Sequence, residues 1–107
     1  MIPYTVIFTP EAEEQLVALY LYIADAAASP TIAERYTTAI ITHCEELQFV
    51  PNRGTKRDDI RPGLRITNYR HRTVIAFAVD DDALKVCIIG IYYGGQDFEA
   101  LLRTDEG

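Results

Sequence analysis

The sequence predicts an α+β fold in which a helical hairpin packs on one face of a mostly antiparallel, four-stranded sheet. Three observations favour this fold. Residues 10–50 hold two successive stretches whose apolar side chains recur at helical spacing. After residue 63 the apolar residues instead alternate with a period of two, in three successive stretches. A β-branched and aromatic stretch precedes the first helix, so the expected order is β-α-α-β-β-β with a short C-terminal helix turn.

The opening strand, residues 4–9, is followed by two helices that begin with the same signal. Thr9-Pro10 and Ser29-Pro30 each place a hydroxyl before a proline, because the hydroxyl can accept a free backbone N–H and proline has none to satisfy. The first helix is expected to reach about Ala27, and the second to end at the breakers of residues 51–54. The expected buried stripes are Ala12, Leu16, Leu19 and Ile23, then Ala33, Tyr36, Ile40, Cys44 and Leu47.

Three later strands are predicted to form an antiparallel meander, at Leu64–Tyr69, Arg72–Val79 and Leu84–Tyr92. The last is apolar on both faces and is expected to be central. Its predicted faces are Leu84, Val86, Ile88 and Tyr92 on one side, and Cys87, Ile89, Ile91 and Tyr93 on the other. A helical hairpin covers only one face of such a sheet, and a single turn of helix at residues 97–102 adds little area. An exposed apolar groove for a protein partner is therefore expected.

Length and composition predict one soluble domain spanning residues 1–107, with enough apolar residues for a core. No apolar run is long enough to span a membrane, and the first residues lack the basic segment of a signal peptide. Cys44 and Cys87 are expected to be reduced core thiols. No metal site and no cofactor is expected, because His43 has no second ligand at metal spacing and no glycine-rich phosphate loop is present.

The basic residues are concentrated in one segment of an acidic chain. Residues 53–72 hold seven of the ten Lys and Arg, whereas the whole chain has a formal net charge of −6. One interpretation is internal ion pairing, with Arg57 or Arg61 meeting Asp58 or Asp59. The other is a local surface for an acidic partner, since guanidinium groups bind carboxylates and phosphates in a bidentate manner. A mixed arrangement combines the two, with Arg65, Arg70 and Arg72 facing the partner. The acidic balance argues against sequence-specific binding of duplex DNA.

At this point the element order and several short motifs resemble those of a known family, the ParE-type toxins of the ParE/RelE toxin–antitoxin superfamily, also called plasmid-stabilisation systems. The resemblance covers Tyr4 to about Leu102. Its carriers are Thr9-Pro10-Glu11-Ala12, Tyr22-Ile23, Ala33-Glu34-Arg35, Leu47 with Pro51 and Gly54, Arg57-Asp58-Asp59-Ile60-Arg61-Pro62-Gly63-Leu64-Arg65, and Ile91-Tyr92-Tyr93-Gly94-Gly95-Gln96-Asp97-Phe98-Glu99.

This resemblance implies a cytoplasmic toxin that a cognate antitoxin neutralises, and whose target is DNA gyrase. It favours an inhibitor that acts by binding over an enzyme, so no catalytic residue is expected. The surface expected to meet the antitoxin or the target comprises Arg57, Arg61, Arg65, Arg70, Arg72, Tyr92, Tyr93 and Phe98.

Two alternatives remain open from the sequence. RelE-type relatives on the same fold cut messenger RNA in the ribosome, which requires an acid, a base and cations on the phosphate. For that chemistry His71, Arg65 and Tyr93 are the candidates. The family also usually carries a basic residue where this chain has Gln96. A degenerate toxin that serves only as a binding partner is therefore the other alternative.

Overall fold

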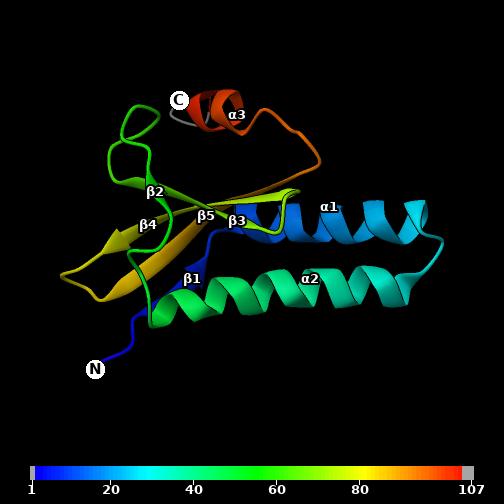
Figure 1. Ribbon diagram of the computed structural model, residues 1–107, viewed down its shortest axis with the longest axis horizontal. Coiled ribbons are helices and arrows are strands. Elements are labelled where there is room, and N and C mark those ends of the chain that lie inside the picture. Colours follow the sequence, from blue (N-terminus) through cyan, green and yellow to red (C-terminus); the bar gives the residue numbers. More distant parts are fainter. Residues whose placement is uncertain (1, 105–107) are drawn as a thin grey trace.

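The chain folds into one sheet with helices on both faces (Figure 1). The computed structural model describes residues 2–104. The elements follow in the order β1 (Thr5–Phe8), α1 (Pro10–Ala26), α2 (Pro30–Glu45), a 3₁₀ helix (Glu46–Gln48), β2 (Thr55–Lys56), β3 (Leu64–Tyr69), β4 (Thr73–Asp80), β5 (Lys85–Tyr93) and α3 (Phe98–Thr104). The predicted α+β class is confirmed.

The two long helices form the predicted antiparallel hairpin, and both predicted caps are present. Thr9 Oγ1 accepts the N–H of Ala12 at 3.1 Å, and Ser29 Oγ accepts the N–H of Ile32 at 3.2 Å. The second helix is shorter than predicted, because after Glu45 the chain tightens into the 3₁₀ helix, which buries Leu47 completely. Within residues 2–104, no helix combines the length and the apolar character that a membrane span requires.

The sheet has five strands rather than the four predicted, in the order β1-β5-β4-β3-β2. β1 runs parallel to β5, and all other pairs are antiparallel. The additional strand, β2, has only two residues, which pair with Ile66 and Arg65 of β3. Its Thr55 and Lys56 are both exposed, so they carry no alternation of apolar and polar residues by which the sequence could reveal a strand.

A bulge in β5 changes which side chains face the hairpin. Ala76 of β4 pairs with Gly90, but the next residue, Phe77, pairs with Ile88, so Ile89 has no partner across the ladder. Before the bulge, Val86 and Ile88 face the hairpin. After it, Ile91 takes that face together with the partly buried Tyr93, while Ile89 and Tyr92 face the opposite side. The predicted faces are therefore correct as far as Ile89 and wrong for Ile91, Tyr92 and Tyr93, because the extra residue shifts the period by one.

The first core lies between the hairpin and the sheet, and its largest fully buried side chains include Phe77, Ile40 and Ile88. Cys44 belongs to this core, and burial raises the pKa of its thiol to about 12. Cys44 and Cys87 are not disulfide-bonded, which agrees with the prediction of reduced thiols.

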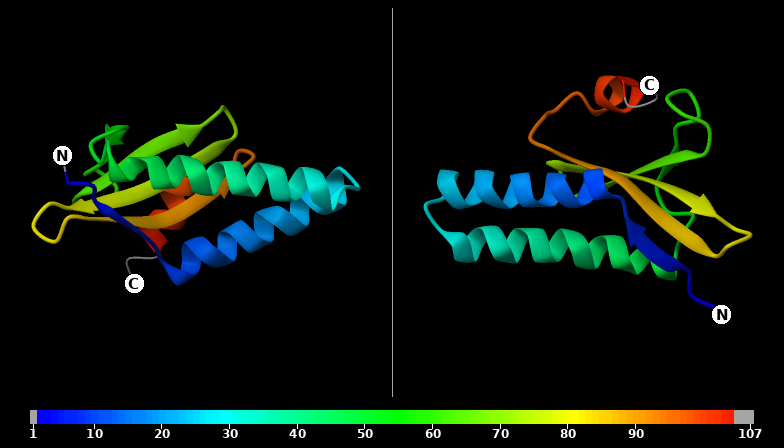
Figure 2. Two further views of the ribbon diagram at one scale, coloured as in Figure 1. Left: turned by 90° about the horizontal axis from the view of Figure 1, so that it is seen from below. Right: turned by 180° about the vertical axis from the view of Figure 1, so that it is seen from behind.

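The second core lies on the opposite face of the sheet, beneath α3 (Figure 2). It consists of Ile60, Leu64, Ile66, Ala76, Tyr92 and Leu102, each less than 9% exposed. The predicted open apolar groove on this face is therefore wrong. The loop that precedes β3 folds over the sheet and adds Ile60 to the Leu102 that α3 supplies. That loop has neither helical nor strand periodicity, so no pattern in its residues indicates that it covers the sheet.

Candidate partner-binding surface

Four tyrosines from separate elements meet where the hairpin crosses the end of β5, and they are called here the tyrosine cluster: Tyr22, Tyr36, Tyr69 and Tyr93. The Tyr36 ring meets the rings of Tyr69 and Tyr93 edge-on, each at 5.7 Å between centroids. Tyr22 of α1 lies 5.9 Å from Tyr93. The Tyr36 hydroxyl shares a 2.8 Å hydrogen bond with Thr73. These contacts hold the rings in fixed orientations, and Tyr22 remains 61% exposed.

The β3–β4 turn brings two arginines onto this cluster. Tyr69 pairs with Thr73, so only residues 70–72 form the turn, and Arg70 takes a left-handed φ of 55°. The Arg70 guanidinium lies 5.5 Å from the centre of the Tyr69 ring, and that of Arg72 lies 5.6 Å from the centre of the Tyr93 ring. Both are cation–π distances, so the two charges are positioned before any partner arrives.

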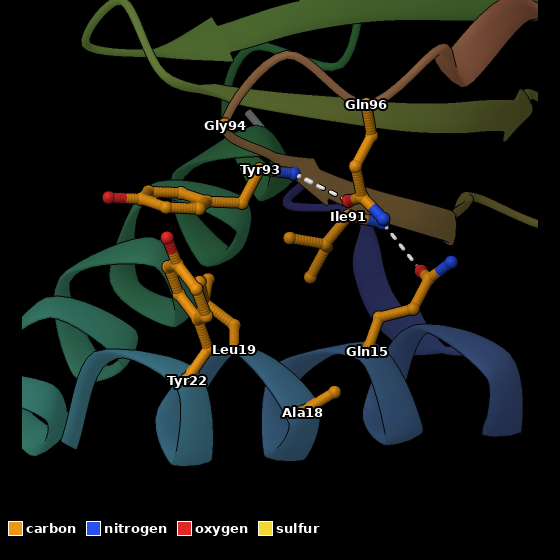
Figure 3. A pocket seen from close by; sticks show the side chains of 8 residues that line it. All are labelled: Gln15, Ala18, Leu19, Tyr22, Ile91, Tyr93, Gly94 and Gln96. Carbon is orange, nitrogen blue, oxygen red and sulfur yellow. Dashed lines mark hydrogen bonds between the residues drawn. The ribbon is translucent and has the colours of Figure 1, made fainter. Parts of the chain in front are cut away.

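A groove of about 390 Å³ opens beside the cluster, between α1 and the end of β5 (Figure 3). β1 ends opposite Ile88, so the rest of β5 lacks a strand on that side. Two glutamine side chains replace it. Gln15 Oε1 accepts the N–H of Ile91 at 2.7 Å, and Gln96 Oε1 accepts that of Tyr93 at 2.9 Å. The groove is therefore a sheet edge whose backbone donors are already satisfied.

Two arginines that were predicted to meet a partner, Arg57 and Arg61, fasten α3 to the loop before β3. Arg57 binds Asp59 through two hydrogen bonds of 2.9 Å and also binds Glu99 of α3. Arg61 donates a 2.7 Å hydrogen bond to the carbonyl of Leu102. The contacts of Arg57 therefore agree with the interpretation of internal ion pairing. Its two hydrogen bonds to Asp59 have the bidentate geometry that a guanidinium group favours with a carboxylate.

The contact between Arg57 and Asp59 makes the stability of the fold depend on pH. The Arg57 hydrogen bond to Asp59 lowers the pKa of that carboxyl below the ordinary value of 3.8. A depressed pKa in the folded state stabilises the fold above the ordinary value, and this contribution is lost as the pH falls through the lowered one. We expect Asp59→Asn to lower the urea midpoint at neutral pH, and the difference from the wild-type protein to shrink below pH 3.8.

Asp82→Asn is a suitable control, because Asp82 lies in an exposed turn and its carboxylate makes no hydrogen bond or ion pair within residues 2–104. It should leave the midpoint unchanged across the same pH range. A constant difference between Asp59→Asn and the wild-type protein from neutral to acid would contradict the assigned role of Arg57.

The other predicted site residues lie in several places. Arg65 donates to the backbone carbonyls of Asn52 and Arg53. Tyr92 is 2% exposed in the second core, where Phe98 packs beside it. Of the eight residues predicted to meet a partner, Arg70, Arg72 and Tyr93 lie at the tyrosine cluster, whereas Arg57, Arg61 and Phe98 lie at α3.

The three residues considered for ribonuclease chemistry do not converge. Arg65 pairs with Phe77 in the sheet, whereas Tyr93 pairs with Thr73 at the end of the same strand. Four residues along a strand separate those positions by about 13 Å. His71 is exposed in the turn beside Tyr93, at the far end of β3 from Arg65.

Sequence reasoning did not assign four residues of this surface to it: Gln15, Tyr22, Tyr36 and Tyr69. The helical spacing predicts that Tyr36 is buried, and Tyr22 belongs to a family motif, but neither pattern indicates that rings distant in the sequence meet. Gln15 gives no signal, because a glutamine on a helix is ordinarily solvated. Its role depends on β1 ending early, which only the three-dimensional structure shows.

The fold is that of toxins found in bacterial toxin–antitoxin systems. The chain is similar to a chain of the chromosomal ParDE toxin–antitoxin system of P. aeruginosa, with 22% identity, 87% of this chain and 98% of the other covered, and a TM-score of 0.72. A chain of the RelBE2 toxin–antitoxin complex of Mycobacterium tuberculosis shares 24% identity, with 90% and 97% covered and a TM-score of 0.64. A mutant of the E. coli toxin RelE in the free state shares 14%, with 97% of each chain covered and a TM-score of 0.60.

At these identities the structural likenesses establish the fold alone, and no curated protein matches the sequence. The family is established separately by sequence. Residues 6–98 match the family model of the ParE toxin of the type II toxin–antitoxin system parDE. The chain therefore belongs to the ParE toxin family, as the motifs in its sequence predicted.

Proposed function

We propose that this protein is the toxin of a type II toxin–antitoxin module, that it acts in the cytoplasm by binding and inhibiting DNA gyrase, and that a cognate antitoxin neutralises it. The family match over residues 6–98 carries this proposal. The structural likeness to chains of a ParDE system and of a RelBE2 toxin–antitoxin complex supports the antitoxin as partner.

The arrangement of the candidate surface supports inhibition by binding rather than by catalysis. Arg65 is engaged by the carbonyls of the loop at Asn52 and Arg53, so it is not directed at the turn that holds His71. The tyrosine cluster and the groove beside it offer rigid aromatic and apolar surface next to positioned charges. Rigid aromatic and arginine side chains are typical anchors of protein interfaces.

The proposal is tested by expression and by a gyrase assay. Expression of this chain alone is expected to arrest growth, and co-expression of the product of the adjoining reading frame should relieve the arrest. Purified protein at micromolar concentration should inhibit supercoiling by gyrase, and the antitoxin should restore it. Unaffected supercoiling together with growth arrest would eliminate gyrase as the target while leaving the antitoxin assignment intact.

One observation favours a second candidate, a ribosome-dependent mRNA interferase. His71 lies between Arg70 and Arg72 in one turn, and the Arg72 guanidinium is stacked on Tyr93. A potential acid or base therefore lies in the same turn as two cations, one of which contacts a phenol. Cleavage of a translated message, seen by primer extension and lost in His71→Ala, would support this function. A message that stays intact during growth arrest would exclude it.

A further inference from the structure

Three arginines have neither an ion pair nor a side-chain hydrogen bond within residues 2–104, in a protein with more acidic than basic groups. Arg53, Arg57 and Arg103 form ion pairs, and Arg61 and Arg65 donate to backbone carbonyls. Within residues 2–104, in contrast, no carboxylate lies within 4.0 Å of Arg35, Arg70 or Arg72. These three lie on adjoining elements, on α2 and in the β3–β4 turn.

Two of these arginines line a hollow with an apolar wall. The hollow, of about 210 Å³, lies between α2 and the end of β3, and we call it the Arg35–Arg70 hollow. It is lined by Ile32, Arg35, Tyr36, Ala39, Tyr69 and Arg70. Ile32 is 50% exposed there, although it is a large aliphatic side chain. A ligand that fits must therefore offer negative charge to the two guanidinium groups and apolar surface to the wall.

On these grounds we propose that the Arg35–Arg70 hollow binds an acidic segment of the antitoxin, with a carboxylate between the two guanidinium groups and an aliphatic side chain against Ile32. This inference rests on the proposed function, since it places one contact of that partner. Bidentate guanidinium–carboxylate pairs are strong and directional, and an adjoining apolar contact excludes water from them. Because Arg70 is already held on the Tyr69 ring, less conformational entropy is lost on binding.

The ring geometry favours a peptide over a single-stranded nucleic acid. Binding of single strands relies on free aromatic faces on which bases stack. Here Tyr69 already contacts Arg70, Tyr36 and His43, with ring centroids 5.7 and 5.4 Å away for the last two. The three arginines that lack a carboxylate partner within residues 2–104 are also few for a phosphate-binding surface, on a chain of net charge −6.

The test measures binding of the purified antitoxin encoded by the adjoining reading frame. The double variant Arg35→Glu/Arg70→Glu should weaken binding by about tenfold or more, because it places like charges against the partner's carboxylate. Arg35→Lys/Arg70→Lys should retain part of the affinity, and wild-type affinity should fall with added salt more steeply than that of the Glu variant. Lys56→Glu is the matched control, since Lys56 is exposed in β2 and makes no ion pair within residues 2–104. It should change affinity less than about twofold.

The possible results distinguish failure of this inference from failure of the proposed function. If the antitoxin binds the wild-type protein and the folded Glu variant equally, the hollow is not its site, although the proposed function stands. If the antitoxin fails to bind the wild-type protein, the proposed partner itself is wrong. If a single-stranded RNA of 20 nucleotides binds the wild-type protein and the Lys56→Glu control but not the Arg35→Glu/Arg70→Glu variant, the hollow is part of a nucleic-acid-binding surface and the inference is wrong. Circular dichroism melting verifies that each variant is folded.

Discussion

Leu102→Ala is expected to lower the free energy of unfolding by about 2–5 kcal/mol, the range for a leucine removed from a well-packed core. Leu102 of α3 is 0% exposed and belongs to the second core. The helix spans only Phe98–Thr104 and is too short to be stable alone, so its position depends on this side chain and on the Arg57 and Arg61 contacts. Urea denaturation measures the loss.

Leu101→Ala provides the control within the same helix. Leu101 is 42% exposed, so its truncation removes similar helix propensity but little buried area, and it should cost less than about 1 kcal/mol. Hydrogen exchange adds a local readout, since loss of Leu102 should also remove protection from the α3 amides. Equal effects of the two variants would show that α3 is not anchored by its buried leucine.

Gly90→Ala is expected to destabilise the fold by about 1–3 kcal/mol through overpacking. The Tyr92 ring lies over Gly90, and a Cβ added there would come within 2.6 and 2.7 Å of the Tyr92 ring atoms Cζ and Cε2. Alanine ordinarily gains about 0.4–1 kcal/mol over glycine by restricting the unfolded chain. The clash outweighs that gain, because the ring is only 2% exposed and packed against the second core.

A double-mutant cycle separates the clash from any general effect of alanine in the strand. Tyr92→Leu removes the ring, so Gly90→Ala should cost much less in that background, with a coupling of about 0.5–3 kcal/mol. Equilibrium unfolding of the four proteins measures it. If Gly90→Ala costs the same with and without the ring, then the reason for glycine at this position is the backbone and not the ring of Tyr92.

The helical hairpin could be predicted closely from the sequence because its signals are local. Thr9-Pro10 and Ser29-Pro30 identify both helix starts, and the caps found in the structure are the ones expected. The sheet was predicted less completely. Pairing of Thr55–Lys56 with β3 and the unpaired Ile89 both depend on the register between strands, and a single strand read by itself carries no information about register.

The segment of residues 53–72 separates into two parts in three dimensions. Arg57, Arg61 and Arg65 bind groups of their own chain and stabilise the loop and α3, whereas Arg70 and Arg72 remain available at the turn. The pairing of Arg57 with Asp59 is local and agrees with the interpretation of internal ion pairing, whereas the contacts of Arg57 with Glu99 and of Arg61 with Leu102 join residues some forty positions apart and could not be predicted from the sequence. The candidate surface likewise draws rings from four elements.

The bulge at Ile89 also governs how β5 tolerates changes in length. Deletion of Ile89 would leave a regular strand in which Ile88, Ile91 and Tyr93 still share one face, because the residue lost is the one without a partner. Deletion of a residue between Ile91 and the end of the strand would exchange the faces of everything after it. Between Ile89 and the end of β5, a deletion compatible with both cores is therefore confined to this one position, and the other positions can vary by substitution but not by deletion.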